Sequence, residues 1–214
     1  MGVNTMDIPE VKRDGKLISR LLAAILVGFD RVMDKESQLY LRLLARLVDK
    51  SFMEYGLVRE FLLEEIKSND KLAYRIEIIN HLENCVSAIS RASKIMDRLA
   101  NGVSFKDGTK IKKDLDIYKF VSEETRKKVV TKSVSGVRNR VEHIDEDVYL
   151  NKFKDRLLLD VSDDYQNINI NGKSVPLMDL ANMITTYHEL TLEIFSRLPK
   201  KWENGKYYYD EIPK

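Results

Sequence analysis

The spacing of apolar residues is the strongest constraint in this sequence, because they recur every three or four positions through most of residues 39–99. That period places apolar side chains along one side of an α-helix. One stripe runs from Leu39 to Ile66. A second begins at Leu72, after Ser68-Asn69-Asp70, and ends before Asn101-Gly102, a pair that commonly terminates helices. With only 4 Pro in 214 residues, the chain is predicted to fold around long amphipathic helices.

Similar patterns predict the remaining elements. Apolar residues crowd together over 17–33, a helix is expected from about residue 122 to 150, and a last amphipathic stripe covers 180–198. Between them, residues 157–175 alternate in the manner of β-strands around Asn171-Gly172, a pair typical of tight hairpin turns. We therefore expect one all-α domain over 1–214, a helical bundle with a small β-hairpin before its last helix, a frayed segment over 1–15 and a C-terminal tail over 199–214.

Composition excludes several classes of protein. A single cysteine, Cys85, rules out an internal disulfide framework and a zinc ribbon, and its place in an amphipathic helix favours packing over nucleophilic chemistry. The longest apolar run, residues 21–29, falls far below the roughly 20 residues of a membrane span. No small-residue cleavage site follows that run, which argues against a secretory signal. We expect a cytoplasmic protein that does not contact membranes.

Charge is distributed unevenly along the chain. The whole sequence has a net charge of +2, yet residues 105–140 contain eleven Lys or Arg and five Asp or Glu. A basic stretch of this kind favours binding of a polyanion such as RNA, with Lys132 and Arg140 as candidate substrate-binding residues. The alternative is a solvated, lysine-rich loop and helix start.

One helix carries the most specific signal. Its apolar residues are spaced 4, 3, 4, 3 and 4 apart and form a single seam of Val130, Val134, Val137, Val141, Ile144 and Val148. At about 100° per residue, Asn139 and His143 fall on the side opposite this seam. We therefore expect His143 to be exposed or to face a partner. His81 and His188, by contrast, neighbour apolar residues on ordinary helices and are interpreted as structural.

The sequence Arg138-Asn139-Arg140-Val141-Glu142-His143 is an R-x4-H motif with a polar residue directly after the arginine. Motif and predicted layout resemble the HEPN family (higher eukaryotes and prokaryotes nucleotide-binding), in particular its abortive-infection and toxin-type ribonucleases. The resemblance implies a metal-independent endoribonuclease without a cofactor. It also implies a homodimer, and an antitoxin or a regulatory RNA or protein as a further partner. One branch of the family has a tyrosine two residues after the histidine; this chain has Asp145 there.

The residue types of the motif suit RNA cleavage. RNA supplies its own nucleophile, the 2′-hydroxyl, so an enzyme needs proton transfer and charge stabilisation. Histidine can serve as general acid or base near neutral pH, which makes His143 a candidate for both roles. Arg138 would hold the phosphate oxygens, Asn139 would orient the histidine or bind the phosphate, and Glu142 would support the arginine.

The residues around the motif allow two alternatives. The acidic residues around His143 suggest a metal site, but the sequence has no H-E-x-x-H and no second cluster, so we expect no bound metal. The other alternative is a catalytically inactive HEPN-like module that binds RNA or protein.

Overall fold

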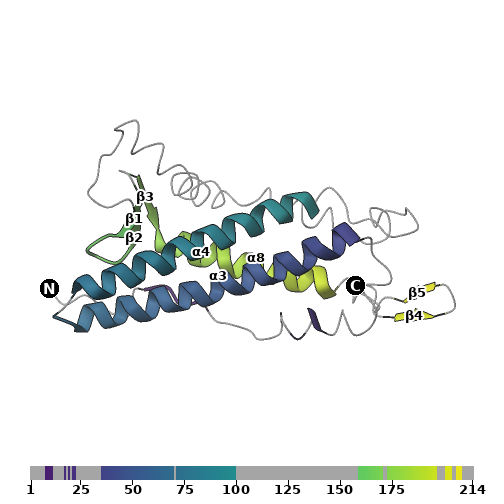
Figure 1. Cartoon of the computed structure of the whole chain (residues 1–214), viewed down its shortest axis with the longest axis horizontal. Coiled ribbons are helices and arrows are strands. Elements are labelled where there is room, and N and C mark those ends of the chain that lie inside the picture. The colour runs from purple at the N-terminus through teal and green to yellow at the C-terminus, as the bar shows by residue number, and fades with distance from the viewer. Residues whose placement is uncertain are drawn as a thin grey trace. The chain divides into compact units, whose positions relative to one another are not determined.

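The computed structural model describes residues 8–11, 17, 19, 21–22, 35–69, 71–99, 159–170, 173–196, 201–203 and 206–208 (Figure 1). Three long helices dominate this part of the chain: α3 (Lys35–Lys67), α4 (Lys71–Leu99) and α8 (Leu177–Ser196). All three were predicted from apolar periodicity. The predicted helix over 17–33 is described at four residues, Leu17, Ser19, Leu21 and Leu22, which are helical, and the predicted helix over 122–150 lies outside the described residues.

The chain divides into two compact units. The first contains residues 1–13, 50–91 and 129–185, and the second contains 14–49, 92–128 and 186–214. Residues of α3, α4 and α8 occur in both units.

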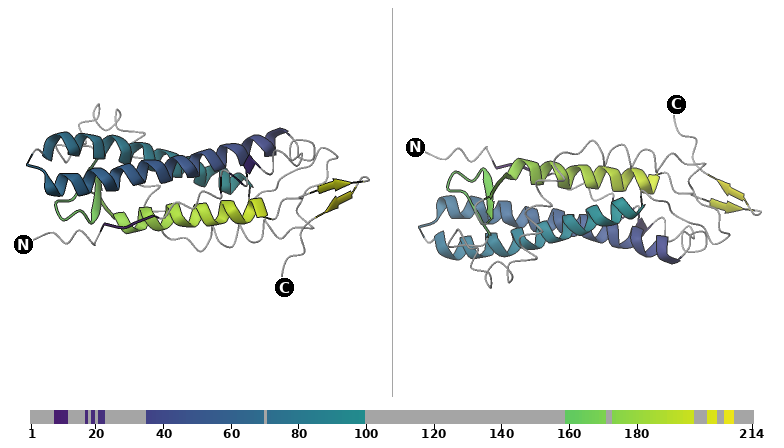
Figure 2. Two further views of the ribbon diagram at one scale, coloured as in Figure 1. Left: turned by 90° about the horizontal axis from the view of Figure 1, so that it is seen from below. Right: turned by 90° about the horizontal axis from the view of Figure 1, so that it is seen from above.

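In the first unit, α3 and α4 pack side by side in antiparallel directions (Figures 1 and 2). Ser68 ends α3 by donating its backbone N–H to the carbonyl oxygens of Glu64 and Glu65 at 3.0 and 3.2 Å. Along the pair, residues of α3 meet residues of α4 in reversed order: Ser51 contacts Cys85, and Glu65 contacts Arg75. Most of the predicted stripes face inward, with Phe52, Leu62, Leu82, Val86 and Ile89 buried. The expectation was wrong at the start of each stripe, because Leu39, Leu43, Leu72 and Ile76 are exposed.

A three-stranded antiparallel sheet precedes α8, with strand order β1 (Leu159–Val161), β2 (Asn167–Ile170) and β3 (Lys173–Pro176). The predicted hairpin is confirmed by the pairing of β2 with β3, and β1 lies on the other side of β2 as a third strand. Ile168 is paired with Val161 on one neighbour and with Val175 on the other, and all three side chains are buried. Pro176 is the last residue of β3, and α8 begins at the next residue.

The second unit contains a core of its own. Its buried side chains include Leu41, Leu44 and Val48 from α3, Met96 from α4, and Tyr187 and Ile194 from α8. The Tyr187 hydroxyl donates to Ser93 Oγ at 2.9 Å, which links α8 to α4 within this unit. His188, which sequence analysis interpreted as structural, is also buried.

The C-terminal tail contains a feature that the sequence analysis missed. Strands β4 (Lys201–Glu203) and β5 (Lys206–Tyr208) pair antiparallel, with Trp202 opposite Tyr207. The strands are too short for a clear alternating period, which is why apolar periodicity did not reveal them. A local signal was present, because Asn204-Gly205 separates them and this pair favours two-residue hairpin turns.

Among the described residues, no helix is both long enough and apolar enough to cross a lipid bilayer.

Candidate functional site

The residues of the predicted ribonuclease site all lie outside the described residues. This applies to the R-x4-H motif itself, Arg138 to His143, with Asn139, Arg140 and Glu142 inside it, and to Lys132 and the valine seam. It applies equally to the acidic residues next to the motif that suggested a metal site. The predictions for these positions therefore stay predictions. What the structure describes is a set of polar side chains on α3, α4 and the sheet, all within the first unit.

Arg75 of α4 lies at the centre of the largest polar cluster. Its Nη2 is 2.7 Å from Glu65 Oε1 of α3, and its Nη1 is 3.2 Å from Asp160 Oδ1 of β1. The same Nη1 donates to the backbone carbonyl of Val161 at 2.6 Å. The planar guanidinium presents several N–H donors in fixed directions, which suits simultaneous contacts to two carboxylates and a carbonyl. Arg75 therefore connects both helices to the edge of the sheet.

Tyr165 covers this cluster from the loop between β1 and β2. Arg75 Cζ lies 5.8 Å from the centroid of its ring, and its hydroxyl donates to Glu65 Oε1 at 3.4 Å. Burial, together with the negative charge of Glu65, raises the pKa of the Tyr165 hydroxyl above its ordinary value, so the hydroxyl keeps its proton. Tyr165 has a φ of 61°, in the left-handed region that non-glycine residues seldom adopt. The loop accepts this conformation where the tyrosine reaches the buried ion pair.

The Arg75 cluster is structural in character. Glu65 is fully buried and Arg75 is only 15% exposed, so the opposite charges neutralise each other away from solvent. Glu65 Oε2 has no hydrogen-bond partner among the described residues. A substrate phosphate would have to displace a carboxylate to reach this arginine, and for that reason we do not assign the cluster a catalytic role.

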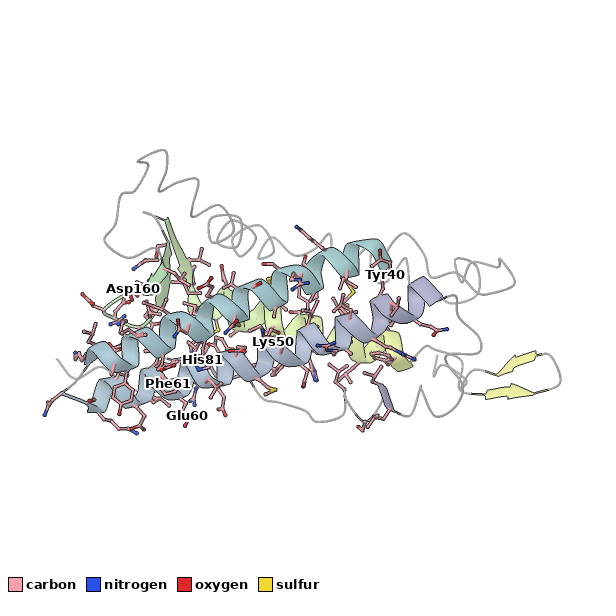
Figure 3. All side chains as sticks on the ribbon, viewed as in Figure 1. Tyr40, Lys50, Glu60, Phe61, His81 and Asp160 are labelled. Atoms are coloured by element: carbon pink, nitrogen blue, oxygen red, sulfur yellow. The ribbon has the colours of Figure 1, made fainter. Side chains whose placement is uncertain are left out.

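His81 of α4 forms a second polar contact between the two helices. Its Nδ1 lies 2.8 Å from Glu54 Oε2 of α3, and its Nε2 lies 4.0 Å from Glu77 Oε2, one turn earlier on α4. The ring stacks on Phe61 with centroids 5.5 Å apart and planes inclined by 11° (Figure 3). A carboxylate that orients a histidine is also an element of acid–base sites. Here the ring is packed between α3 and α4, in agreement with the structural interpretation made from the sequence.

Cys85 is buried against α3, and its thiol donates to the backbone carbonyl of Ser51 at 3.4 Å. Burial, with a smaller contribution from Glu54, raises the pKa of this thiol well above its ordinary value. A thiol held in its protonated form is a poor nucleophile. The expectation that Cys85 serves packing is therefore consistent with its surroundings.

The described ranges contain no group of three or more His, Cys, Asp or Glu side chains arranged to hold a metal ion. Sequence analysis did not predict the Arg75 cluster, because Arg75 and Asp160 lie 85 residues apart in the chain. One signal was present at Glu65, which follows Val58 and Leu62 at helical spacing and so falls on the buried side of α3. A glutamate in that position requires a buried partner.

The chain was also compared with known proteins. No family model matches it, and neither a curated protein nor a solved structure shows significant similarity.

Proposed function

We propose that the protein is a metal-independent endoribonuclease of the HEPN type, which acts as a homodimer in toxin or antiphage defence. The observation that carries the proposal is the sequence Arg138-Asn139-Arg140-Val141-Glu142-His143, in a stretch predicted to be a helix with its apolar seam on the side opposite Asn139 and His143. The mostly helical fold, with a small sheet before the last helix, fits the layout expected for this family. The basic stretch over 105–140 supports RNA as the substrate.

The proposed reaction is an internal transesterification. His143 removes the proton from the 2′-hydroxyl, the 2′-oxygen attacks the adjacent phosphorus, and the bond between phosphorus and the 5′-oxygen breaks. Arg138 stabilises the negative charge that develops on the phosphate oxygens. A second histidine returns a proton to the departing 5′-oxygen. The products are a 2′,3′-cyclic phosphate and a 5′-hydroxyl, and the reaction requires no metal.

Helix geometry favours a composite site. Residues five apart on a helix point about 140° away from each other, so one helix presents Arg138 and His143 poorly to a single phosphate. Two copies related by a two-fold axis would place both arginines and both histidines around one cleft. In this arrangement one histidine acts as the base and its equivalent acts as the acid.

A cleavage assay with purified protein tests the proposal. Wild type and His143→Ala are incubated with total RNA in EDTA, with His81→Gln as the matched control because His81 contacts Glu54 and lies outside the motif. We expect wild type and His81→Gln to produce fragments with cyclic phosphate ends, and His143→Ala to lose at least about 100-fold in rate. Equal cleavage by His143→Ala, or cleavage abolished by EDTA, would contradict the mechanism.

The same samples distinguish the alternative function. RNA binding without cleavage, unchanged in His143→Ala, would indicate an inactive RNA-binding module. The toxin role adds a cellular test: expression of wild type should arrest host growth, and expression of His143→Ala should not.

A further inference from the structure

Helix α3 carries a regular row of mostly exposed side chains. Lys50, Met53, Leu57, Glu60 and Glu64 follow each other at intervals of 3, 4, 3 and 4, which confines them to an arc of about 80° around the helix. Four of the five are exposed and Leu57 is half-buried. The Met53 side chain is 51% exposed, which is high for a large apolar residue inside a long helix. We call these five residues the α3 seam.

The charges along the α3 seam are segregated. Lys50 lies at its N-terminal end, Glu60 and Glu64 lie at its C-terminal end, and the apolar Met53 and Leu57 lie between them. Glu64 already pairs with Lys67 at 2.8 Å, so the complementarity rests on Lys50 and Glu60. Arg46, which is also exposed, extends the basic end by one turn. Within the part of the chain that the structure describes, Lys50 and Glu60 form no ion pair; Figure 3 labels both of them on the same helix.

The charges of one α3 seam match those of a second α3 helix that runs in the opposite direction. If two α3 helices cross antiparallel about residue 55, Lys50 lies opposite the second copy's Glu60, and Met53 lies opposite its Leu57. Both contacts occur twice because the interface has two-fold symmetry. A parallel pairing would instead place like charges against each other, which is unfavourable. The charge pattern therefore selects a second copy of this chain, in antiparallel orientation, as the partner.

Gly56 flanks this arc, about 40° beyond Glu60 around the helix, and lies next to the midpoint of the seam along the helix axis. It is exposed, and a Cβ atom added there would meet no atom within 4 Å. Glycine within a helix destabilises it by about 0.5–1 kcal/mol relative to alanine. Packing inside the protomer does not require that residue. A helix that approaches from outside would gain from it, because a position without a side chain lets two backbones come close together.

We infer that the α3 seam is a homodimer contact, in which two α3 helices pack antiparallel through Met53 and Leu57, with Lys50–Glu60 ion pairs at both ends. The inference rests on the proposed function only for the expectation that the protein works as a dimer, and it uses none of the motif residues. A single helix pair is small for an interface, so we expect association that depends on concentration in the micromolar range, roughly 1–100 µM.

Charge reversal tests the ion pairs. Dimerisation of the full chain is measured by sedimentation equilibrium for wild type, Lys50→Glu, Glu60→Lys and the double variant. Each single change places like charges together at two symmetric positions, and we expect the dissociation constant to rise about tenfold. The double variant exchanges the signs and should return to within about threefold of wild type. Lys71→Glu, an exposed change outside the seam, is the control and should leave association unchanged.

Gly56 provides a test that does not depend on charge. The space around it admits a side chain, so Gly56→Ala and Gly56→Leu should both fold, with melting temperatures about 1–4 °C above that of wild type in dilute solution. Leucine would hold the two helices apart, and we expect it to weaken dimerisation at least about tenfold, whereas alanine should change it little.

Several results would overturn the inference. These are a monomer at 100 µM, a dimer that tolerates both single charge reversals, or a dimer unaffected by Gly56→Leu. Each of them concerns association alone, while the proposed ribonuclease activity is judged by RNA cleavage and its loss in His143→Ala. If the protein cleaves RNA but its dimerisation is unchanged in these variants, the α3 seam is not the dimer contact and the proposed function still stands. If dimerisation depends on the α3 seam but the protein cleaves no RNA, the proposed function is wrong and the inferred contact still stands.

Discussion

At the scale of single residues, Glu65 shows how a charge is accommodated inside this fold. It lies on the buried side of α3, where an unpaired carboxylate would be very unfavourable. Arg75 approaches from α4 at 2.7 Å and also binds Asp160 and the Val161 carbonyl, so one guanidinium on α4 meets polar groups of two other elements, α3 and β1. These contacts join the end of the α3–α4 hairpin that contains Glu65 and Arg75 to strand β1.

Removal of Arg75 is expected to be severe. Arg75→Ala leaves Glu65 buried without its counter-ion, and breaking a buried pair in this way typically costs about 3–5 kcal/mol. Arg75→Lys should recover only part of that loss, because one ammonium group lacks the planar fork that reaches Asp160 and Val161 together. Urea denaturation gives the free energies of unfolding. Lys67→Ala, which removes an exposed ion pair to Glu64, is the control and should change stability by less than about 1 kcal/mol. An Arg75→Ala protein as stable as this control would refute the clamp.

At the scale of elements, the sheet depends on one row of side chains. Ile168 in β2 lies between Val161 in β1 and Val175 in β3, and the three are buried on the same face. Such cross-strand contacts stabilise a sheet more than the intrinsic preference of any one strand. Because the strands have only three or four residues each, a row that crosses all three provides a large share of their side-chain contacts.

Truncation of Ile168 tests this dependence. Ile168→Ala removes a fully buried side chain from the middle of the row and should destabilise the protein by about 2–5 kcal/mol, while Ile168→Val should cost about 0.5–1.5 kcal/mol. Asn169→Ala, at the next position on the opposite face, is the matched control, with an expected change below about 1 kcal/mol. Thermal melts monitored by circular dichroism would rank the variants. Equal effects at 168 and 169 would contradict the proposed role of the row.

The elements also show which parts of the fold could be predicted from the sequence. The apolar stripes placed α4 within one residue of its observed start, because a period of 3.6 is a property of local sequence. The pair Asn171-Gly172 likewise located the hairpin, because the preference of this pair for tight turns is also a property of the local sequence. The contact between Arg75 and Asp160 could not be predicted, since it depends on how the chain returns after 85 residues. For the candidate site, the motif supplied residue types and spacing, while the meeting of Arg138 with His143 is a question of assembly that spacing does not answer.

At the scale of the whole molecule, stability is linked to pH through groups buried far apart in the sequence. The Tyr55 hydroxyl donates to the carbonyl of Pro9 at 3.0 Å and thereby attaches the buried segment of Ile8 and Pro9 to α3. Burial raises the pKa of this hydroxyl, and burial likewise raises the pKa of the Cys85 thiol. Both groups therefore keep their protons in the folded state at a pH where the unfolded chain has lost them.

The sign of the linkage follows from that difference. The unfolded chain releases protons from Cys and Tyr near their ordinary pKa values of about 8.5 and 10, whereas the folded chain retains them. Above pH 8.5 the unfolded state thus binds fewer protons, and the free energy of unfolding falls as the pH rises, by up to about 1.4 kcal/mol per pH unit for each group. Urea titrations at pH 7, 8.5 and 10 should show this decline. Cys85→Ala is expected to be less stable at pH 7 but to lose about 1–2 kcal/mol less than wild type between pH 8.5 and 10, because one of the titrating groups is gone. Parallel declines in the two proteins would mean that Cys85 does not titrate on unfolding, and that the alkaline sensitivity has another source.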